Sequence, residues 1–357
     1  MLVTVTTAKD TVAHLRRFVA GNLARGADHL VVFLDDPRAE GQAGPDGAAA
    51  YLRGEPHVTV VECDDAWWGP DRPDNLNARQ RINANVARSV LAEAGVGDWL
   101  FHVDADEVVD VDRDVLDAVP ADVRAVWLAP LEAVARPRWE GEVTHFKRLL
   151  DDADLTLLHV LGVIDRPHNG SYFHGHVDGK SGIRPGHDVW HALHHPVDAA
   201  RERLTGTFAD PRLRVLHHES YDGDEFVRKW TAILSAGPMA NFRAGRAPTA
   251  VALDALIRKG LSPDAARPYL MRIFERTTLD DFDTLRDLGL LEQPGPGTHR
   301  PAALAPDARG RVEELLSGLA GVPKRVFHPG QPAEAVRELF GSGRGGGRGL
   351  RGLLGGR

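Results

Sequence analysis

The stretch Asp98-Trp-Leu-Phe-His-Val-Asp104-Ala-Asp106-Glu107 decides both the fold and the first functional hypothesis. Residues 99–103 form a short apolar run interrupted only by His102, which is typical of a buried strand in a mostly parallel sheet. Three carboxylates follow this strand. Open α/β sheets bind ligands outside the carboxyl ends of their strands. Two aspartates one residue apart offer oxygen ligands to Mg²⁺ or Mn²⁺, so we expect a metal-diphosphate site here.

An Asp-x-Asp triplet is a weak signal by itself, because 51 of the 357 residues are acidic. A second triplet, Asp110-Val-Asp112, follows directly. The alternative interpretation of Asp104 and Asp106 is a solvated turn after the strand. A calcium-binding EF-hand loop is excluded, because Val108 and Val109 stand where that loop needs a ligand and a glycine. The rest of the chain has to distinguish between a metal site and a solvated turn.

Composition sets the class of protein. A hydrophobic content of 43% and a charged content of 26% are ordinary globular values, and the length predicts one large α/β domain with a smaller unit appended. The net charge of −8 argues against nucleic acid as a partner. Cys63 is the single cysteine, which fits a reducing cytoplasm. No transmembrane segment and no signal peptide are predicted.

The amino-terminal third predicts a strand–helix–strand unit with parallel strands. Residues 2–6 and 29–34 have strand patterns, and the periodicity of residues 10–24 indicates a helix between them. A third strand is expected at residues 58–62. Asp35 follows the second strand, where a carboxylate could bind a base or ribose, or cap a helix or turn.

A helix is expected from Asp74 to Glu93, with Ile82, Val86 and Val90 on its buried side. Arg79 and Asn83 lie on the same side, and polar side chains there must find partners. They face either a polar site or a buried carboxylate. We favour the site, because this helix leads into the Asp104 strand.

The richest polar stretch runs from Asn169 to His187 and contains Gly175-His-Val-Asp178-Gly-Lys180-Ser181. It is not a phosphate loop, because three residues instead of four separate Gly175 from Gly179, and Pro185 prevents a following helix. We interpret it as a glycine-rich loop whose Lys180 and Arg184 meet anionic oxygens. The alternative is a surface loop with a solvated lysine.

A last strand is expected at residues 213–216, and His217 follows it as a candidate ligand of the same cation, or as a core histidine. From Asp222 the periodicity is helical, with Ser262-Pro marking a helix start. We expect an α/β domain at residues 1–222, a helical C-terminal region at 223–338 and a flexible Gly/Arg-rich tail at 339–357. The arginines of the tail permit weak contact with an anionic membrane surface.

Four features together resemble family 2-type glycosyltransferases of the GT-A fold, over about residues 1–235. They are residues 2–6, the Leu34-Asp35-Asp36 strand end, Arg79-x-x-x-Asn83 and the Asp98–Glu107 stretch. The Gly175–Ser181 loop, and His217 followed twelve residues later by Lys229, resemble the bacterial branch with an Asp-Ala-Asp-Glu-like strand end. The chain departs from this pattern after its first strand, where Thr6-Thr7-Ala-Lys9-Asp10 replaces an Asn-Glu pair common in relatives.

The resemblance implies a GT-A-like, mostly parallel twisted sheet flanked by helices, with a C-terminal helical appendage. It implies transfer of a sugar from a nucleoside-diphosphate sugar to an acceptor hydroxyl, with Mn²⁺ or Mg²⁺ stabilising the departing diphosphate. The expected ligands of the cation are Asp104, Asp106 and His217. The expected donor-binding residues are Thr6, Asp35, Arg79, Asn83, Asp104 and Arg184. Asp178 is the first candidate for the catalytic base, His176 the second, and Lys180 is expected to contact the diphosphate.

Three other functions remain open. A sugar-1-phosphate nucleotidyltransferase shares the sheet, but it usually has a glycine-rich loop after the first strand, and Thr7-Ala-Lys9-Asp10 has no glycine. A metal-dependent phosphohydrolase would use the histidine clusters, whose spacing matches no His-x-x-x-His site. A non-catalytic binding module would keep the sheet and lose the carboxylates, which are present here.

Overall fold

The computed structural model describes residues 1–235, 247–329, 336 and 338–340, so residues 341–357 of the predicted tail lie outside the described residues. The chain forms two compact units, each described here by itself. Unit 1 comprises Met1–Ala129, Asp178–Val215 and Gly297–Arg357, and unit 2 comprises Pro130–Val177 and Leu216–Pro296. Among the described helices, none combines the length and apolar character needed to cross a bilayer.

Unit 1 is built on parallel strands in the order β4-β1-β2-β3. This confirms the predicted α/β class and the parallel pairing of the first two strands. The sheet is mixed, because β8 pairs antiparallel with β4 and with β6. The strands are β1 (Leu2–Ala8), β2 (His29–Asp35), β3 (Val58–Cys63), β4 (Trp99–His102), β5 (Glu107–Val111), β6 (Ala125–Ala133), β8 (Lys180–Ile183), β9 (Trp190–Ala192), β10 (His195–Val197) and β11 (Phe208–His217).

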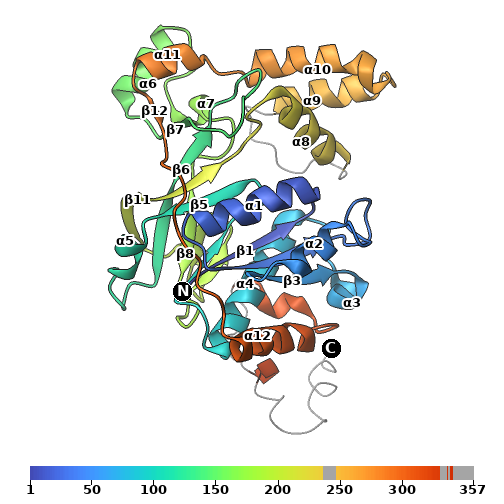
Figure 1. Cartoon of the computed structure of the whole chain (residues 1–357). Coiled ribbons are helices and arrows are strands. Elements are labelled where there is room, and N and C mark those ends of the chain that lie inside the picture. Colours follow the sequence, from blue (N-terminus) through green and yellow to red (C-terminus); the bar gives the residue numbers. More distant parts are fainter. Residues whose placement is uncertain (236–246, 330–335, 337, 341–357) are drawn as a thin grey trace. The chain divides into compact units, whose positions relative to one another are not determined.

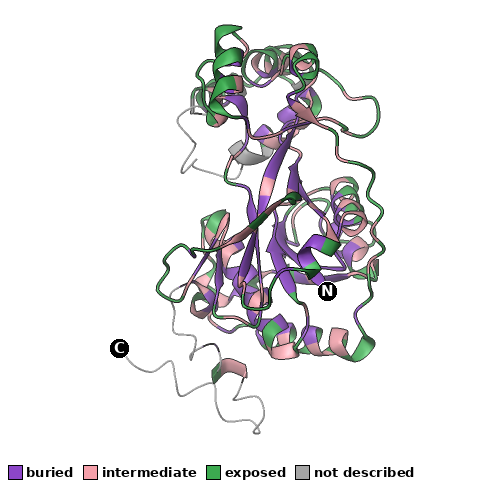
Figure 2. Cartoon of the chain, turned by 90° about the vertical axis from the view of Figure 1, so that its left-hand side faces the viewer, coloured by how far each residue is buried: buried purple, intermediate pink, exposed green. Residues whose placement is uncertain are grey.

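Helices cover both faces of these strands, so the strands are buried on both sides (Figures 1 and 2). Val3 and Val5 of β1 pack in one apolar cluster with α4 and α12, and the alternating Leu2 packs in another with α1. Strands buried on both faces need continuous apolar runs, which is the pattern that predicted them. The helices are α1 (Val12–Ala24), α2 (Ala48–Gly54), α3 (Asp65–Trp68), α4 (Leu76–Ala94), α5 (Arg113–Asp117) and α12 (Pro306–Gly318), with 3₁₀ helices η1 (Gly69–Asp71) and η2 (Lys324–Phe327).

The helix α4 begins and ends at residues with clear local causes. The side chain of Asn75 accepts a hydrogen bond from the backbone N–H of Ala78, which caps the amino end. Gly95 has a positive φ of 66° and ends the helix in the left-handed conformation, which a residue without Cβ adopts at little cost. The helix thus lies within two residues of its predicted bounds.

Unit 2 combines short strands with helices around two apolar clusters. The end of β6 pairs with β7 (Phe146–Lys147), and β7 pairs with β12 (Leu291–Glu292), both antiparallel. Ser262 caps the predicted helix that starts at Pro263, accepting from the N–H of Ala265. The helices are α6 (Asp152–Val160), α7 (Asn169–Tyr172), α8 (Gly223–Ser235), α9 (Ala247–Ile257), α10 (Pro263–Thr277) and α11 (Phe282–Asp287).

A buried aspartate joins the start of the chain to its carboxyl-terminal part within unit 1. Asp28 is 2% exposed and accepts hydrogen bonds from the N–H of Leu2, Arg113, His299 and the N–H of Ala302, at 2.8–3.1 Å. Burial alone would raise the pKa of Asp28, but these donors lower it to about 2. The carboxylate is therefore ionised and fully used as an acceptor.

We expect Asp28→Asn to destabilise unit 1 by about 3–5 kcal/mol, because it leaves buried donors without their charged partner. Urea unfolding at pH 7 measures this. The folded-state pKa lies below the usual 3.8, so the advantage of the wild type is present above pH 3.8 and is lost as the pH falls towards 2. Asp65→Asn is the control, because its ion pair with Arg38 is largely exposed and contributes less than about 1 kcal/mol. Equal losses in the two variants would contradict the anchoring role of Asp28.

Candidate functional site

The first turns of α4 direct polar side chains at the carboxyl ends of three neighbouring strands of unit 1. The strands β4, β1 and β2 lie side by side, with β1 in the middle. Their ends therefore span two interstrand spacings, about 10 Å. The contacts are Gln80 with Asp104 after β4, Asn83 with Thr7 of β1, and Arg79 with Asp35 of β2.

The carboxylate of Asp104 lies between two donors. Its Oδ1 accepts from Gln80 Nε2 at 2.7 Å, and its Oδ2 accepts from Lys180 Nζ at 2.7 Å. Lys180 also lies 3.0 Å from Oε2 of Glu107. The side chains of Lys180 and Glu107 are 1% and 0% exposed, whereas that of Asp104 is 29% exposed. Asp104 thus keeps an open side while its partners are sealed.

The charges of this group compensate one another in part. Burial raises the pKa of Asp104, but the ammonium of Lys180 outweighs it, and the net shift is downward. Burial lowers the pKa of Lys180, but Asp104 and Glu107 raise it above its usual range. Formally, the carboxylates of Asp104, Asp106 and Glu107 against one ammonium give three negative charges and one positive, a net −2. This charge matches that of a divalent cation.

The second Asp-x-Asp triplet has structural roles instead. Asp110 accepts from Arg25 at 2.8 Å and from Arg214 at 2.9 Å. Asp112 caps α5, accepting from the N–H of Asp114 at 3.0 Å. Both carboxylates therefore have structural partners, and the side chain of Asp110 is 15% exposed against 29% for Asp104.

Arg79 contacts a buried carboxylate, which was one of the two alternatives for this residue. Its Nε and Nη2 donate to the two oxygens of Asp35 at 3.1 and 2.8 Å, and Arg72 donates to Oδ1 at 3.0 Å. The side chain of Asp35 is 8% exposed. Asn83 is fully buried and donates to Thr7 Oγ1 at 3.0 Å. These residues form the β1–β2 side of the site.

Two of the predicted donor-binding residues do not join this group. Thr6 is buried, and the alternation along β1 turns it away from the face on which its neighbour Thr7 meets Asn83. Arg184 follows β8 and stacks over Trp99, the first residue of β4. The guanidinium carbon of Arg184 lies 4.1 Å from the centroid of the Trp99 ring. Its guanidinium donates to the carbonyls of residues 119, 120 and 123. Arg184 thus lies at the opposite end of β4 from Asp104.

The expected loop at residues 169–187 is partly regular structure. Its residues 169–172 form α7, and Lys180–Ile183 form β8, which extends the sheet beside β4. The strand is what brings Lys180 to Asp104, because β4 and β8 run in opposite directions. Gly182 faces the ring of Phe101, and a Cβ there would lie 2.3 Å from Cε1 of that ring. The glycine is therefore needed for the pairing.

Unit 2 holds the two predicted histidines next to each other. The rings of His176 and His217 stack with centroids 5.0 Å apart. Nε2 of His217 lies 3.6 Å from Oε2 of Glu219, which pairs with Lys229 at 2.6 Å. Asp178, in contrast, belongs to unit 1 and is exposed, with its carbonyl accepting from Trp127 Nε1 at 2.8 Å. A shared cation between His217 and the two aspartates stays a prediction.

A buried ion cluster in unit 2 fixes the backbone beside these histidines. Lys147 and Glu132 are fully buried and lie 2.9 Å apart, and Asp280 pairs with the same ammonium at 3.1 Å. Glu132 also accepts from the N–H groups of His174 and Gly175. A Cβ at Gly175 would lie 2.5 Å from Cε1 of His217, so only glycine allows this approach.

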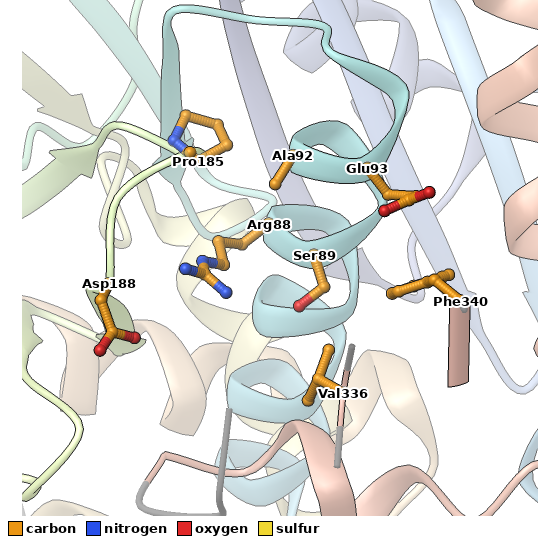
Figure 3. Close-up of a pocket in the computed structure, with 9 residues that line it drawn as sticks. Arg88, Ser89, Ala92, Glu93, Pro185, Asp188, Val336 and Phe340 are labelled. Atoms are coloured by element: carbon orange, nitrogen blue, oxygen red, sulfur yellow. The ribbon is translucent and has the colours of Figure 1, made fainter. Parts of the chain in front are cut away.

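A surface hollow of unit 1 involves the other half of α4 (Figure 3). No residue predicted for the site contributes to it. It is lined by Arg88, Ser89, Ala92, Glu93, Pro185, Gly186, Asp188, Val336 and Phe340.

The sequence pattern does not predict a role in the site for Gln80 or Glu107, although both contact Asp104. Glu107 stood within the quoted stretch, and its position three residues after Asp104 is the spacing of a turn in which a side chain can bind the backbone. Gln80 carried no comparable signal. A polar residue beside Arg79 could be solvated or buried. Only the placement of α4 against the sheet determines that Gln80 is buried.

The core beneath Asp104 contains two buried imidazoles, His102 and His191, with ring centroids 6.2 Å apart. Burial lowers the pKa of His102 from 6.5 to about 4. The unfolded state therefore takes up the proton first as the pH falls. We expect the contribution of His102 to stability to be complete above about pH 6.5 and to decrease by about 3 kcal/mol towards pH 4. Urea unfolding at several pH values should show a smaller decrease for His102→Gln than for the wild type, and parallel curves would contradict the assignment.

Comparisons with known proteins give no match from which a function could be inferred, so the proposal below is based on the chemistry of the site. A scan against protein-family models finds no match, and a search of curated proteins finds no similar sequence.

Proposed function

We propose that this protein is a glycosyltransferase of the GT-A type that moves a sugar from a nucleoside-diphosphate donor to an acceptor hydroxyl. The observation that carries the proposal is the partly exposed, ionised carboxylate of Asp104 at the carboxyl end of β4, with Asp106 two residues later. Parallel α/β sheets bind ligands at this edge. The polar contacts of α4 with three strand ends support a site at the same edge.

The residues present fit a divalent cation. Asp104 and Asp106 supply the hard oxygen ligands that Mg²⁺ and Mn²⁺ prefer, and the group around them carries a formal charge of −2. When bound, the cation would offset the negative charge that forms on the departing diphosphate. Asp104 and Asp106 would hold it. Lys180 is sealed behind Asp104, so its ammonium serves this carboxylate and does not reach the diphosphate directly.

The donor nucleoside would bind over the β1–β2 side of the site. The resemblance assigns Asp35 to the base. Asp35 is held by Arg79 through two hydrogen bonds, which fix the plane of the carboxylate. On the middle strand, Asn83 donates one hydrogen bond to Oγ1 of Thr7. In this proposal α4 aligns the two ends of the donor, with Arg79 and Asn83 below the nucleoside and Gln80 below the diphosphate.

The acceptor hydroxyl needs a base, and Asp178 remains the first candidate. Its side chain is exposed, and its backbone carbonyl accepts from Trp127 Nε1, so the carboxylate stands on a fixed main chain and reaches solvent. His176 is half-buried against His217 and stays the second candidate.

We expect Asp104→Ala and Asp106→Ala each to lower the transfer rate by about 10²–10³-fold, because each removes a group that stabilises the leaving charge. A thermal-shift screen of nucleoside diphosphates with Mn²⁺ identifies the donor base first. A nucleotide at 100 times its Kd should raise the stability of the wild type by about 2.7 kcal/mol. The same shift should vanish in both variants and in EDTA.

The control for this experiment is Asp46→Ala, which removes an exposed carboxylate elsewhere in unit 1. It should keep both the shift and the turnover. Full turnover in EDTA would remove the metal role. Nucleotide binding without any turnover, in the wild type and with a range of acceptors, would instead favour a non-catalytic binding module.

Asp178→Asn should lower transfer to the acceptor by about 10²–10⁴-fold while the Kd of the nucleotide stays the same, because a general base acts on the acceptor alone. Steady-state transfer and nucleotide binding are measured on the same preparation. Equal losses in rate and in nucleotide affinity would place the base elsewhere, and His176→Ala is then the next variant.

A further inference from the structure

Both oxygens of the Asp104 carboxylate are held. Gln80 donates to Oδ1 and Lys180 donates to Oδ2, each at 2.7 Å from opposite sides. A rotation of the carboxylate about its Cβ–Cγ bond would break both hydrogen bonds at once. Hydrogen bonds to a charged acceptor are stronger than those between neutral groups, so one orientation of the carboxylate is strongly preferred.

The backbone of the same residue is held by the same group. The N–H of Asp104 donates to Oε2 of Glu107 at 2.7 Å, and the N–H of Glu107 donates to the carbonyl of Asp104 at 3.0 Å. Oε2 of Glu107 also lies 3.0 Å from the ammonium of Lys180. Main chain, glutamate, lysine and aspartate side chain therefore form a closed ring around one residue.

Asp104 is open on one side, and its partners are buried. This suggests that Asp104 contacts a ligand while the buried partners orient it. Carboxylates that bind metals are commonly oriented by further hydrogen bonds from residues behind them. We propose that Gln80, Lys180 and Glu107 are positioning residues that hold Asp104 in the orientation in which it binds the divalent cation. This inference rests on the proposed function and names the residues on which its cation affinity depends.

The three partners have no net charge, so their effect on the orientation of Asp104 can be tested without changing the net charge of the site. Lys180 and Glu107 carry opposite formal charges and Gln80 is neutral, so the three together do not change the formal charge of the site. Their contribution is geometric. It can therefore be removed without altering the formal charge of −2 that Asp104 and Asp106 carry.

The first test is Gln80→Met, which keeps the size of the side chain and removes its donor. Mn²⁺ binding is titrated by electron paramagnetic resonance with no sugar nucleotide present, and unfolding in urea is recorded in parallel. We expect the Kd for Mn²⁺ to rise about 10-fold or more. The matched control is Gln42→Met. Gln42 is also buried and donates its Nε2 to the carbonyl of Asp10 at 2.9 Å, so this variant should lose similar stability and keep its Mn²⁺ affinity.

The second test is the double variant Glu107→Gln with Lys180→Met, which removes one negative and one positive charge. Replacing a buried ion pair by neutral groups is often tolerated by the fold. The Kd for Mn²⁺ should rise about 10–100-fold at unchanged formal charge. If either the Gln80 variant or the double variant fails to fold, the Mn²⁺ affinity of the other variant tests the positioning role.

The outcomes separate the two proposals. Weaker Mn²⁺ binding in the Gln80 and the double variant, with the Gln42 control unchanged, supports the positioning role. Wild-type affinity in either folded variant overturns it and leaves the proposed function intact. A wild type that binds no Mn²⁺ overturns the metal role of Asp104 and the positioning proposal together.

Discussion

The ammonium of Lys180 is buried, and the carboxyl end of β4 depends on how that charge is compensated. A buried lysine without a partner would lose its proton or unfold the region around it, because moving an ion out of water costs several kcal/mol. Asp104 and Glu107 lie within 3.0 Å of the ammonium and keep it charged. The same contacts keep Asp104 ionised and oriented. The requirement to neutralise one buried cation thus fixes the orientation of the carboxylate at the end of β4.

The helix α4 connects the end of β4 with the ends of the neighbouring strands β1 and β2 through its polar side chains. Its apolar side packs against the sheet through Ile82, Val86 and Val90, which fixes its rotation about its axis. Once that rotation is fixed, the polar residues of the first turns must meet the strand ends, and each finds a partner there. The packing of the core therefore sets the geometry of the site, so core substitutions under α4 would disturb the site without touching a polar residue.

Some of this could be predicted from the sequence, and the limits have physical causes. Apolar runs predicted β1, β2, β3 and β4, and helical periodicity predicted α1 and α4, because burial leaves a period in the chain. The strand β8 was missed because Gly182 and Pro185 are typical of loops, although Gly182 is needed for close pairing. Contacts such as Asp28 with His299 join residues far apart in the chain, and no local pattern encodes them. Arg79 was placed on the correct side of its helix, but its partner depended on tertiary structure.

The two Asp-x-Asp triplets show why a motif acquires its role from what surrounds it. Asp110 and Asp112 have the same spacing as Asp104 and Asp106, yet two arginines and the amino end of α5 take up their oxygens. The side chain of Asp110 is 15% exposed, and each of its two oxygens accepts from an arginine. Asp104 has two donors on its buried side and an open side beyond them. The spacing of the residues is equal in both triplets, so the difference in their partners comes from the fold and not from the motif.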